Sequence, residues 1–145
     1  MHSITTYSNG THRSEVIHLW EKVFGYETAH NTPSVAIDKK LETKDDLFFV
    51  ATFEEKVIGT MLAGYDGHRG WLYSVEVDHS NRMKGVGTAL VRHAEQALAG
   101  RGCMKINLQI MSDNESVCGF YKSLGYTPEK RVSMGKRIPE NIPCD

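Results

Sequence analysis

Two glycines and two basic residues lie together between a predicted strand and a predicted long helix. Gly85 and Gly87 form the glycine pair, and Arg82 and Lys84 precede Gly85. Glycine lets backbone N–H groups approach a ligand closely, and the N-terminus of a helix favours an anion. Two glycines can also simply begin a helix. The whole arrangement of strand, cations, glycines and helix favours a site for a phosphate or diphosphate group.

Two other phosphate motifs fit this segment less well. The dinucleotide-binding fingerprint needs a third small residue where Leu90 stands. The P-loop needs a lysine followed directly by serine or threonine, whereas Lys84 is followed by Gly85. The segment therefore predicts a phosphate site of another class.

The pattern of apolar residues predicts the strands and helices that would position this segment. Strands are predicted where β-branched and aromatic residues concentrate, at residues 4–7, 47–53, 57–65, 71–77, 105–111 and 132–137. Helices are predicted where apolar residues recur at helical spacing, at residues 16–24, 33–43, 85–101 and 114–124. The first helix has a candidate cap at Thr11 or Ser14, and the second has a thin apolar stripe of Val35, Ala36 and Leu41.

The order of these elements predicts an α/β fold with one mixed sheet. The strands at 71–77 and 105–111 should be parallel, because a connection of that length carries a right-handed crossover helix. The three strands from residue 47 to residue 77 are joined by short turns and should be antiparallel. We therefore expect helices on both faces of the sheet and a single domain over residues 1–145.

Composition argues against several classes of function. The 17 basic and 18 acidic residues leave a formal net charge of -1. The sequence therefore lacks the excess of positive charge that is typical of nucleic-acid-binding proteins. Cys103, Cys118 and Cys144 are odd in number and contain no CxxC motif, which favours free thiols in a reducing compartment. The histidines lack the spacing of metal ligands, and no apolar stretch approaches the length of a membrane span. We expect a cytoplasmic protein without a metal ion or a membrane partner.

Over nearly its whole length the sequence resembles the GNAT superfamily, the Gcn5-related N-acetyltransferases. Arg82, Gly85 and Gly87 match its acetyl-CoA signature, which is Gln or Arg, two residues, Gly, one residue, and Gly or Ala. Residues 64–70 further resemble the small bacterial stand-alone enzymes of the YpeA type. A second family pattern is matched further along the chain by Asn114, Val117, Phe120, Tyr121, Gly125 and Tyr126.

This resemblance implies a mostly antiparallel sheet whose parallel fourth and fifth strands splay apart and receive the pantetheine arm of acetyl-CoA. Acetyl-CoA would be the co-substrate. Met83 stands where family members often have glycine, and Asn114 is equally suited to capping a helix. The residues assigned to acetyl-CoA by the resemblance are Val75, Val77, Arg82, Met83, Lys84, Gly85, Val86, Gly87, Thr88, Asn114 and Tyr121.

The resemblance also implies an N-acetyltransferase reaction, in which a primary amine of a small molecule or peptide attacks the thioester directly and forms a tetrahedral intermediate. Tyr121 would be the acid near the leaving sulfur, and its alternative role is that of a core tyrosine. Glu76 is a candidate base, although strand alternation could equally direct it to solvent. The alternative function is a non-catalytic acyl-CoA-binding sensor or interaction module on the same fold. The acceptor, the acyl chain length and a homodimeric state stay open.

Overall fold

The computed structural model describes residues 2–24, 32–82 and 84–139. The chain forms two compact units, Met1–Gln109 and Ile110–Asp145, and each is described by itself. The expectation of one domain over residues 1–145 stays a prediction. The loop expected between the first two helices falls almost entirely outside the described residues.

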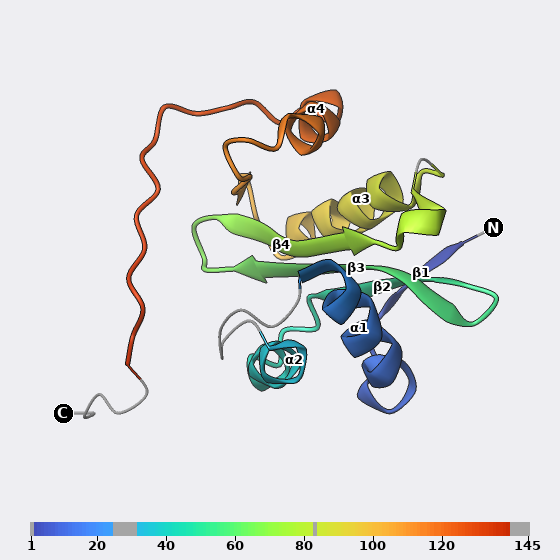
Figure 1. The fold of residues 1–145 in the computed structure, drawn as a ribbon. Helices are drawn as coiled ribbons and strands as arrows, with labels where there is room; N and C mark the ends of the chain where they lie inside the picture. Colours follow the sequence, from blue (N-terminus) through green and yellow to red (C-terminus); the bar gives the residue numbers. More distant parts are fainter. Residues whose placement is uncertain (1, 25–31, 83, 140–145) are drawn as a thin grey trace. The chain divides into compact units, whose positions relative to one another are not determined.

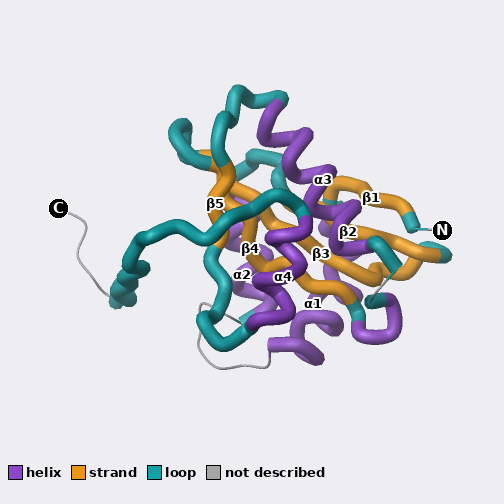
Figure 2. The backbone as a smooth tube through the Cα atoms, turned by 90° about the horizontal axis from the view of Figure 1, so that it is seen from above, coloured by secondary structure: helices purple, strands orange, loops and turns teal. Residues whose placement is uncertain are grey.

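The first unit contains a five-stranded sheet in the order β1-β2-β3-β4-β5. The first three pairings are antiparallel, and β4 pairs with β5 in parallel. Figure 2 shows β1 and β5 at opposite edges of this sheet. The predicted mixed sheet with one parallel pair is confirmed. Its strands are β1 (Ser3–Thr6), β2 (Phe48–Phe53), β3 (Lys56–Tyr65), β4 (Gly70–Val77) and β5 (Ile106–Leu108).

Helices cover both faces of this sheet, as the sequence predicts. The helix α3 (Val86–Ala99) lies on one face, and α1 (Asn9–Phe24) and α2 (Pro33–Glu42) lie on the other (Figure 1). A short 3-10 helix, η2 (His79–Asn81), follows β4. In the second unit, α4 (Glu115–Ser123) is followed by an extended segment.

The α1 face of the sheet is packed around stacked aromatic rings. The ring centroids of Tyr7 and Phe48 lie 4.1 Å apart, and those of Trp20 and Phe48 lie 5.8 Å apart with nearly parallel planes. Val16 and Leu62 are buried in the same cluster. This packing holds the indole of Trp20 in one orientation, with its N–H directed at Thr60 of β3.

Four details of the sequence interpretation are wrong. The helix α1 begins at Asn9 rather than after a cap at Thr11 or Ser14, because the Ser8 carbonyl accepts bonds from the Thr11 and His12 amides. In α2 the stripe residues Val35 and Leu41 are exposed, and Ile37 is buried instead.

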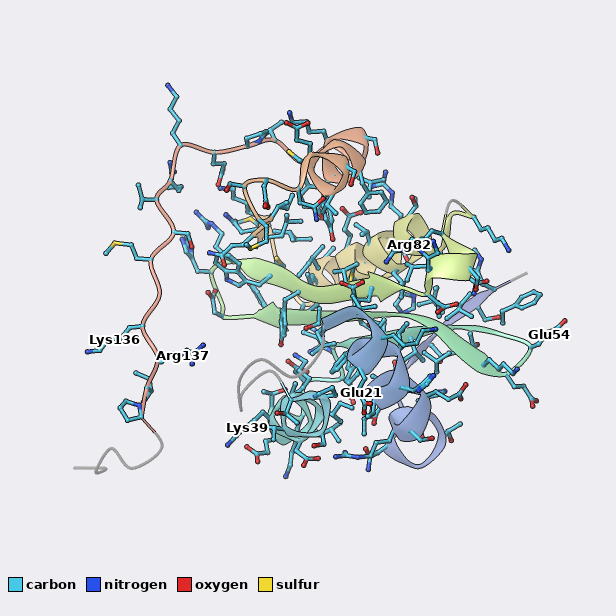
Figure 3. The ribbon with its side chains drawn as sticks, in the orientation of Figure 1. Glu21, Lys39, Glu54, Arg82, Lys136 and Arg137 are labelled. Atoms are coloured by element: carbon cyan, nitrogen blue, oxygen red, sulfur yellow. The ribbon has the colours of Figure 1, made fainter. Side chains whose placement is uncertain are left out.

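The third wrong detail is the strand predicted at residues 132–137. This segment forms no strand among the described residues, and Val132 and Met134 are 87% and 90% exposed. Its local pattern suits a strand, but a strand also requires a hydrogen-bonded neighbour. Figure 3 shows Lys136 and Arg137 along this extended segment. The fifth strand is also shorter than predicted, since β5 covers only Ile106–Leu108.

Gly59 on β3 allows α3 to pack closely against the sheet. A Cβ atom on Gly59 would lie 3.1 Å from the Glu76 carbonyl oxygen and from Leu90 Cδ1, and 3.2 Å from Val86 Cγ1. Val86 is the first residue of α3. The missing side chain therefore lets the start of α3, and the glycine-rich loop before it, lie against the end of β4.

Replacing Gly59 with valine should push the first turn of α3 away from the sheet. Such overpacking costs roughly 1–3 kcal/mol, so the free energy of unfolding in urea should fall by about that amount. Gly10→Ala is the control, because a Cβ atom there meets nothing within 4 Å and alanine favours the helix. Native stability of the Gly59→Val protein would contradict the close approach of α3.

Candidate functional site

The parallel pair of strands separates along the length of β4. Pairing with β5 covers Gly70 to Leu72 on β4, whereas β4 itself continues to Val77. The Asp78 amide donates to the Ile58 carbonyl of β3 at 2.7 Å. Because successive amides in a strand point to opposite edges, the Val77 amide points away from β3, toward the edge that β5 leaves open.

A bulge interrupts β4 just before this open stretch. Thr60 of β3 pairs with Glu76 and Leu62 pairs with Tyr73, so one residue of β3 faces two residues of β4. The two β4 residues between these pairs are Ser74 and Val75. Ser74 has a φ of 49°, which lies in the left-handed region. The bulge shifts the alternation of side chains, so Tyr73 and Glu76 project from the same face of the sheet although they are three residues apart.

Glu76 projects toward the α1 side of the sheet. Residues directly opposite one another in neighbouring strands share a face. Thr60 is opposite Glu76, and its Oγ1 accepts a hydrogen bond from Trp20 Nε1 of α1 at 2.8 Å. The sequence left open whether Glu76 points toward the site or toward solvent. In the structure its side chain lies on the α1 face and is partly buried.

Burial raises the pKa of Glu76 to about 7. The nearby positive charge of Arg82 acts in the opposite direction and lowers the pKa, but it is the smaller effect. A carboxyl group with this pKa is close to half ionised at neutral pH. It can therefore accept a proton and release it again in that range, which a general base needs.

The glycine-rich loop leaves the first amides of α3 without a side-chain cap. Gly85 is the N-cap residue with a φ of 78°, and no side chain bonds to the helix start. The first N–H groups of a helix have no partner within the helix and carry its positive dipole end. Gly87 and Thr88 supply two of these amides, while the side chain of Val86 is buried beneath the loop. This geometry suits an anion such as a diphosphate.

Arg82 connects this loop to the open edge of β4. Its Nε lies 3.2 Å from the Val77 carbonyl oxygen, and Figure 3 shows the side chain near the start of α3. Arg82 and Lys84 are both exposed, so their charges are available to a ligand. Met83 lies outside the described residues. Val75, Val77 and the loop thus form one continuous row of candidate contacts.

The remaining predicted site residues belong to the second unit. Asn114 caps α4, since its Oδ1 accepts a hydrogen bond from the Val117 amide at 3.3 Å. Tyr121 is 6% exposed and contacts the rings of Phe120 and Tyr126 edge-on. The structure therefore groups the predicted site residues in two sets: Glu76 with the loop in one unit, Asn114 with Tyr121 in the other.

Residues 13–126 match the model of the Acetyltransferase (GNAT) family. The chain belongs to this family. An acetyltransferase of Pectobacterium atrosepticum, ECA0875, is 38% identical over 126 residues, which cover 87% of this chain and 89% of the relative. The resemblance to the GNAT superfamily in the sequence is confirmed.

Solved structures have the same fold. Glucosamine-6-phosphate N-acetyltransferase from Arabidopsis thaliana has a TM-score of 0.72 at 19% identity, and the match covers 96% of this chain and 99% of that one. AAC(6')-Iy in complex with the bisubstrate analogue CoA-S-monomethyl-acetylneamine has a TM-score of 0.77 at 17% identity, again covering 96% and 99%. The mixed α/β fold of this GNAT chain is therefore confirmed.

Sequence reasoning missed two residues that support the GNAT site. Thr60 and Trp20 bond to one another beneath Glu76, but neither belongs to a motif. The signal that could have indicated them is weak: a threonine and a tryptophan at predicted core positions, each with a polar atom that requires a partner when buried.

The described part of the GNAT chain contains neither a cluster of metal ligands nor a helix that could span a membrane. Across residues 2–24, 32–82 and 84–139, no three His, Cys, Asp or Glu side chains gather into a group that could hold a metal ion. The helices of the same residues are too short or too polar to span a bilayer.

Proposed function

We propose that this GNAT protein transfers the acetyl group of acetyl-CoA to a primary amine of a small molecule or peptide, with Glu76 as the general base. The observation that carries the proposal is the placement of Glu76. The bulge directs this side chain to the α1 face, beside the open edge of β4, and burial raises its pKa to about 7. Family membership supplies the acetyltransferase chemistry.

The glycine-rich loop would hold the diphosphate of acetyl-CoA. Its residues fit that role, because Gly85 exposes uncapped amides and Arg82 and Lys84 add positive charge. The Val75 and Val77 backbones would pair with the amides of the pantetheine arm, as an added strand would. The complex of AAC(6')-Iy with a CoA-containing analogue supports the use of this co-substrate. The family resemblance adds Asn114 as a further candidate contact of acetyl-CoA.

In the proposed reaction, the amine nitrogen bonds to the acetyl carbonyl carbon and the carbon–sulfur bond then breaks. The nitrogen must lose a proton, and it becomes much more acidic once it has bonded to carbon. A carboxylate with a pKa of about 7 is strong enough to take that proton, directly or through a water. Tyr121 would return a proton to the leaving thiolate, a contribution of roughly 10²-fold.

The acceptor would approach Glu76 from the face that α1 and α2 cover. Tyr73 projects from this face beside Glu76 and is 44% exposed. The buried Lys40 of α2 lies 5.6 Å from the centroid of its ring and bonds to Asp45 at 2.8 Å. The Tyr73 ring therefore rests on a fixed charge from α2 and offers an aromatic surface to the body of the acceptor.

Replacing Glu76 with glutamine tests the base assignment. The wild-type kcat/KM, calculated per neutral amine, should rise with pH through about 7, because only the carboxylate accepts the proton. Glu76→Gln should abolish this rise and lower the plateau by about 10²-fold. Thiol release from acetyl-CoA with a panel of amines measures both effects.

Glu55→Gln is the matched control, since Glu55 is exposed in the turn between β2 and β3 and loses the same charge. It should leave the profile unchanged. A Glu76→Gln enzyme with the wild-type plateau and pH profile would show that Glu76 is not the base. Tight binding of CoA without turnover of any amine by the wild type would favour the sensor alternative.

Replacing Gly87 with aspartate tests the loop. The new carboxylate would occupy the anion position at the start of α3, so the affinity for CoA should fall at least tenfold by calorimetry, or about 1.4 kcal/mol. The fold should survive, because aspartate is favourable in the first turn of a helix. Gln96→Glu adds the same charge at an exposed position of α3 and is the control. Unchanged affinity in Gly87→Asp would remove the loop from the site.

A further inference from the structure

A buried chain of hydrogen bonds connects α1 to the bulge of β4. Trp20 Nε1 donates to Thr60 Oγ1 at 2.8 Å, and Thr60 Oγ1 donates to the Ser74 carbonyl at 3.2 Å. Trp20 is 2% exposed and Thr60 is fully buried. These two hydrogen bonds therefore link a helix, the central strand and the bulge, and the Trp20–Thr60 bond is fully buried.

The two hydrogen bonds can run in only one direction, from Trp20 to Thr60 and from Thr60 to Ser74. An indole N–H can only donate, and a carbonyl oxygen can only accept. The Thr60 hydroxyl can do both, so it accepts from Trp20 and directs its single proton to Ser74. The stacking of Trp20 on Phe48 fixes the indole at the start of the chain. The direction of the Thr60 hydroxyl is thus determined by the core.

Ser74 needs this support because its backbone is strained. Its φ of 49° lies in the left-handed region, which is sterically unfavourable for a residue with a Cβ atom. Such strain persists only where surrounding contacts fix it. The bulge also removes Ser74 from the regular register with β3, and its partly buried carbonyl still requires a donor. Thr60 supplies that donor.

We propose that Trp20 and Thr60 are positioning residues that hold the β4 bulge and thereby orient Glu76 toward the acceptor. The proposal rests on the function proposed above, in which Glu76 is the base. Neither residue touches a substrate in this account. They act through the Ser74 carbonyl, two residues before Glu76. A regular β4 would instead direct Glu76 to the opposite face, against α3.

Replacing Thr60 tests this role with little change in shape. Thr60→Val removes the hydroxyl and leaves both Trp20 Nε1 and the Ser74 carbonyl without this partner. We expect kcat to fall at least tenfold while KM for acetyl-CoA stays within about twofold, because the glycine-rich loop is not altered. Thr60→Ser keeps the hydroxyl and should recover most of the rate. Thr5→Val, an exposed threonine on β1, is the matched control. An unchanged kcat in Thr60→Val would overturn the proposal.

A double-mutant cycle shows whether the effect passes through Glu76. Thr60→Val should cost much less in a Glu76→Gln background than in the wild type, because the base is already absent. Where Glu76→Gln itself lowers kcat, fully additive losses would overturn the proposal. Trp20→Phe removes the N–H while keeping an aromatic ring, and should reproduce the loss of kcat. It serves as the test variant if Thr60→Val does not fold.

The structure of the folded variant separates this proposal from the proposed function. In Thr60→Val we expect Ser74 to leave the left-handed region and the Glu76 side chain to move. If both stay in place, the positioning role is wrong whatever the activity. If both move but Glu76→Gln alone leaves turnover intact, the positioning role survives and the base assignment fails.

Discussion

The extra residue in β4 is the constraint on which the candidate site depends. Strand alternation would place Tyr73 and Glu76 on opposite faces, and the bulge places them on the same one. The bulge requires Ser74 to adopt the unfavourable left-handed backbone conformation. The surrounding core offsets that cost with a hydrogen bond from Thr60 to the Ser74 carbonyl. A carboxyl group is thereby fixed where it is partly buried and stays protonated up to about neutral pH.

The two ends of the open β4 edge are connected by close packing. Gly59 lets the start of α3 approach β3 and the backbone of Glu76, and Arg82 bonds back to the Val77 carbonyl. The uncapped amides at the start of α3 and the candidate base therefore belong to parts of the chain that pack closely together. A thioester held by its diphosphate would lie along the same strand as Glu76. This would be the physical link between the proposed phosphate loop and acyl-transfer chemistry.

Local patterns predicted the loop and most of the fold, and failed where distant contacts decide. The spacing of Gly85 and Gly87 lies within one turn of chain, so the sequence alone located the glycine-rich loop before α3, whose phosphate-binding role stays a prediction. The residues at 71, 73, 75 and 77 alternate regularly and gave no sign of a bulge. Its support comes from residues far away in the sequence, because Thr60 is 14 residues from Ser74 and Trp20 is a further 40 residues from Thr60. The segment at 132–137 has a strand pattern but no strand partner among the described residues.

The most direct test of the account is a carbon-13 NMR titration of the Glu76 carboxyl carbon in the intact protein, with the signal assigned from Glu76→Gln. The account predicts a midpoint at about pH 7, because the bulge holds this side chain where burial disfavours its charge. A midpoint near that of an ordinary glutamate, at about 4.3, would mean that Glu76 is freely hydrated. That result would contradict the placement from which the proposed function follows.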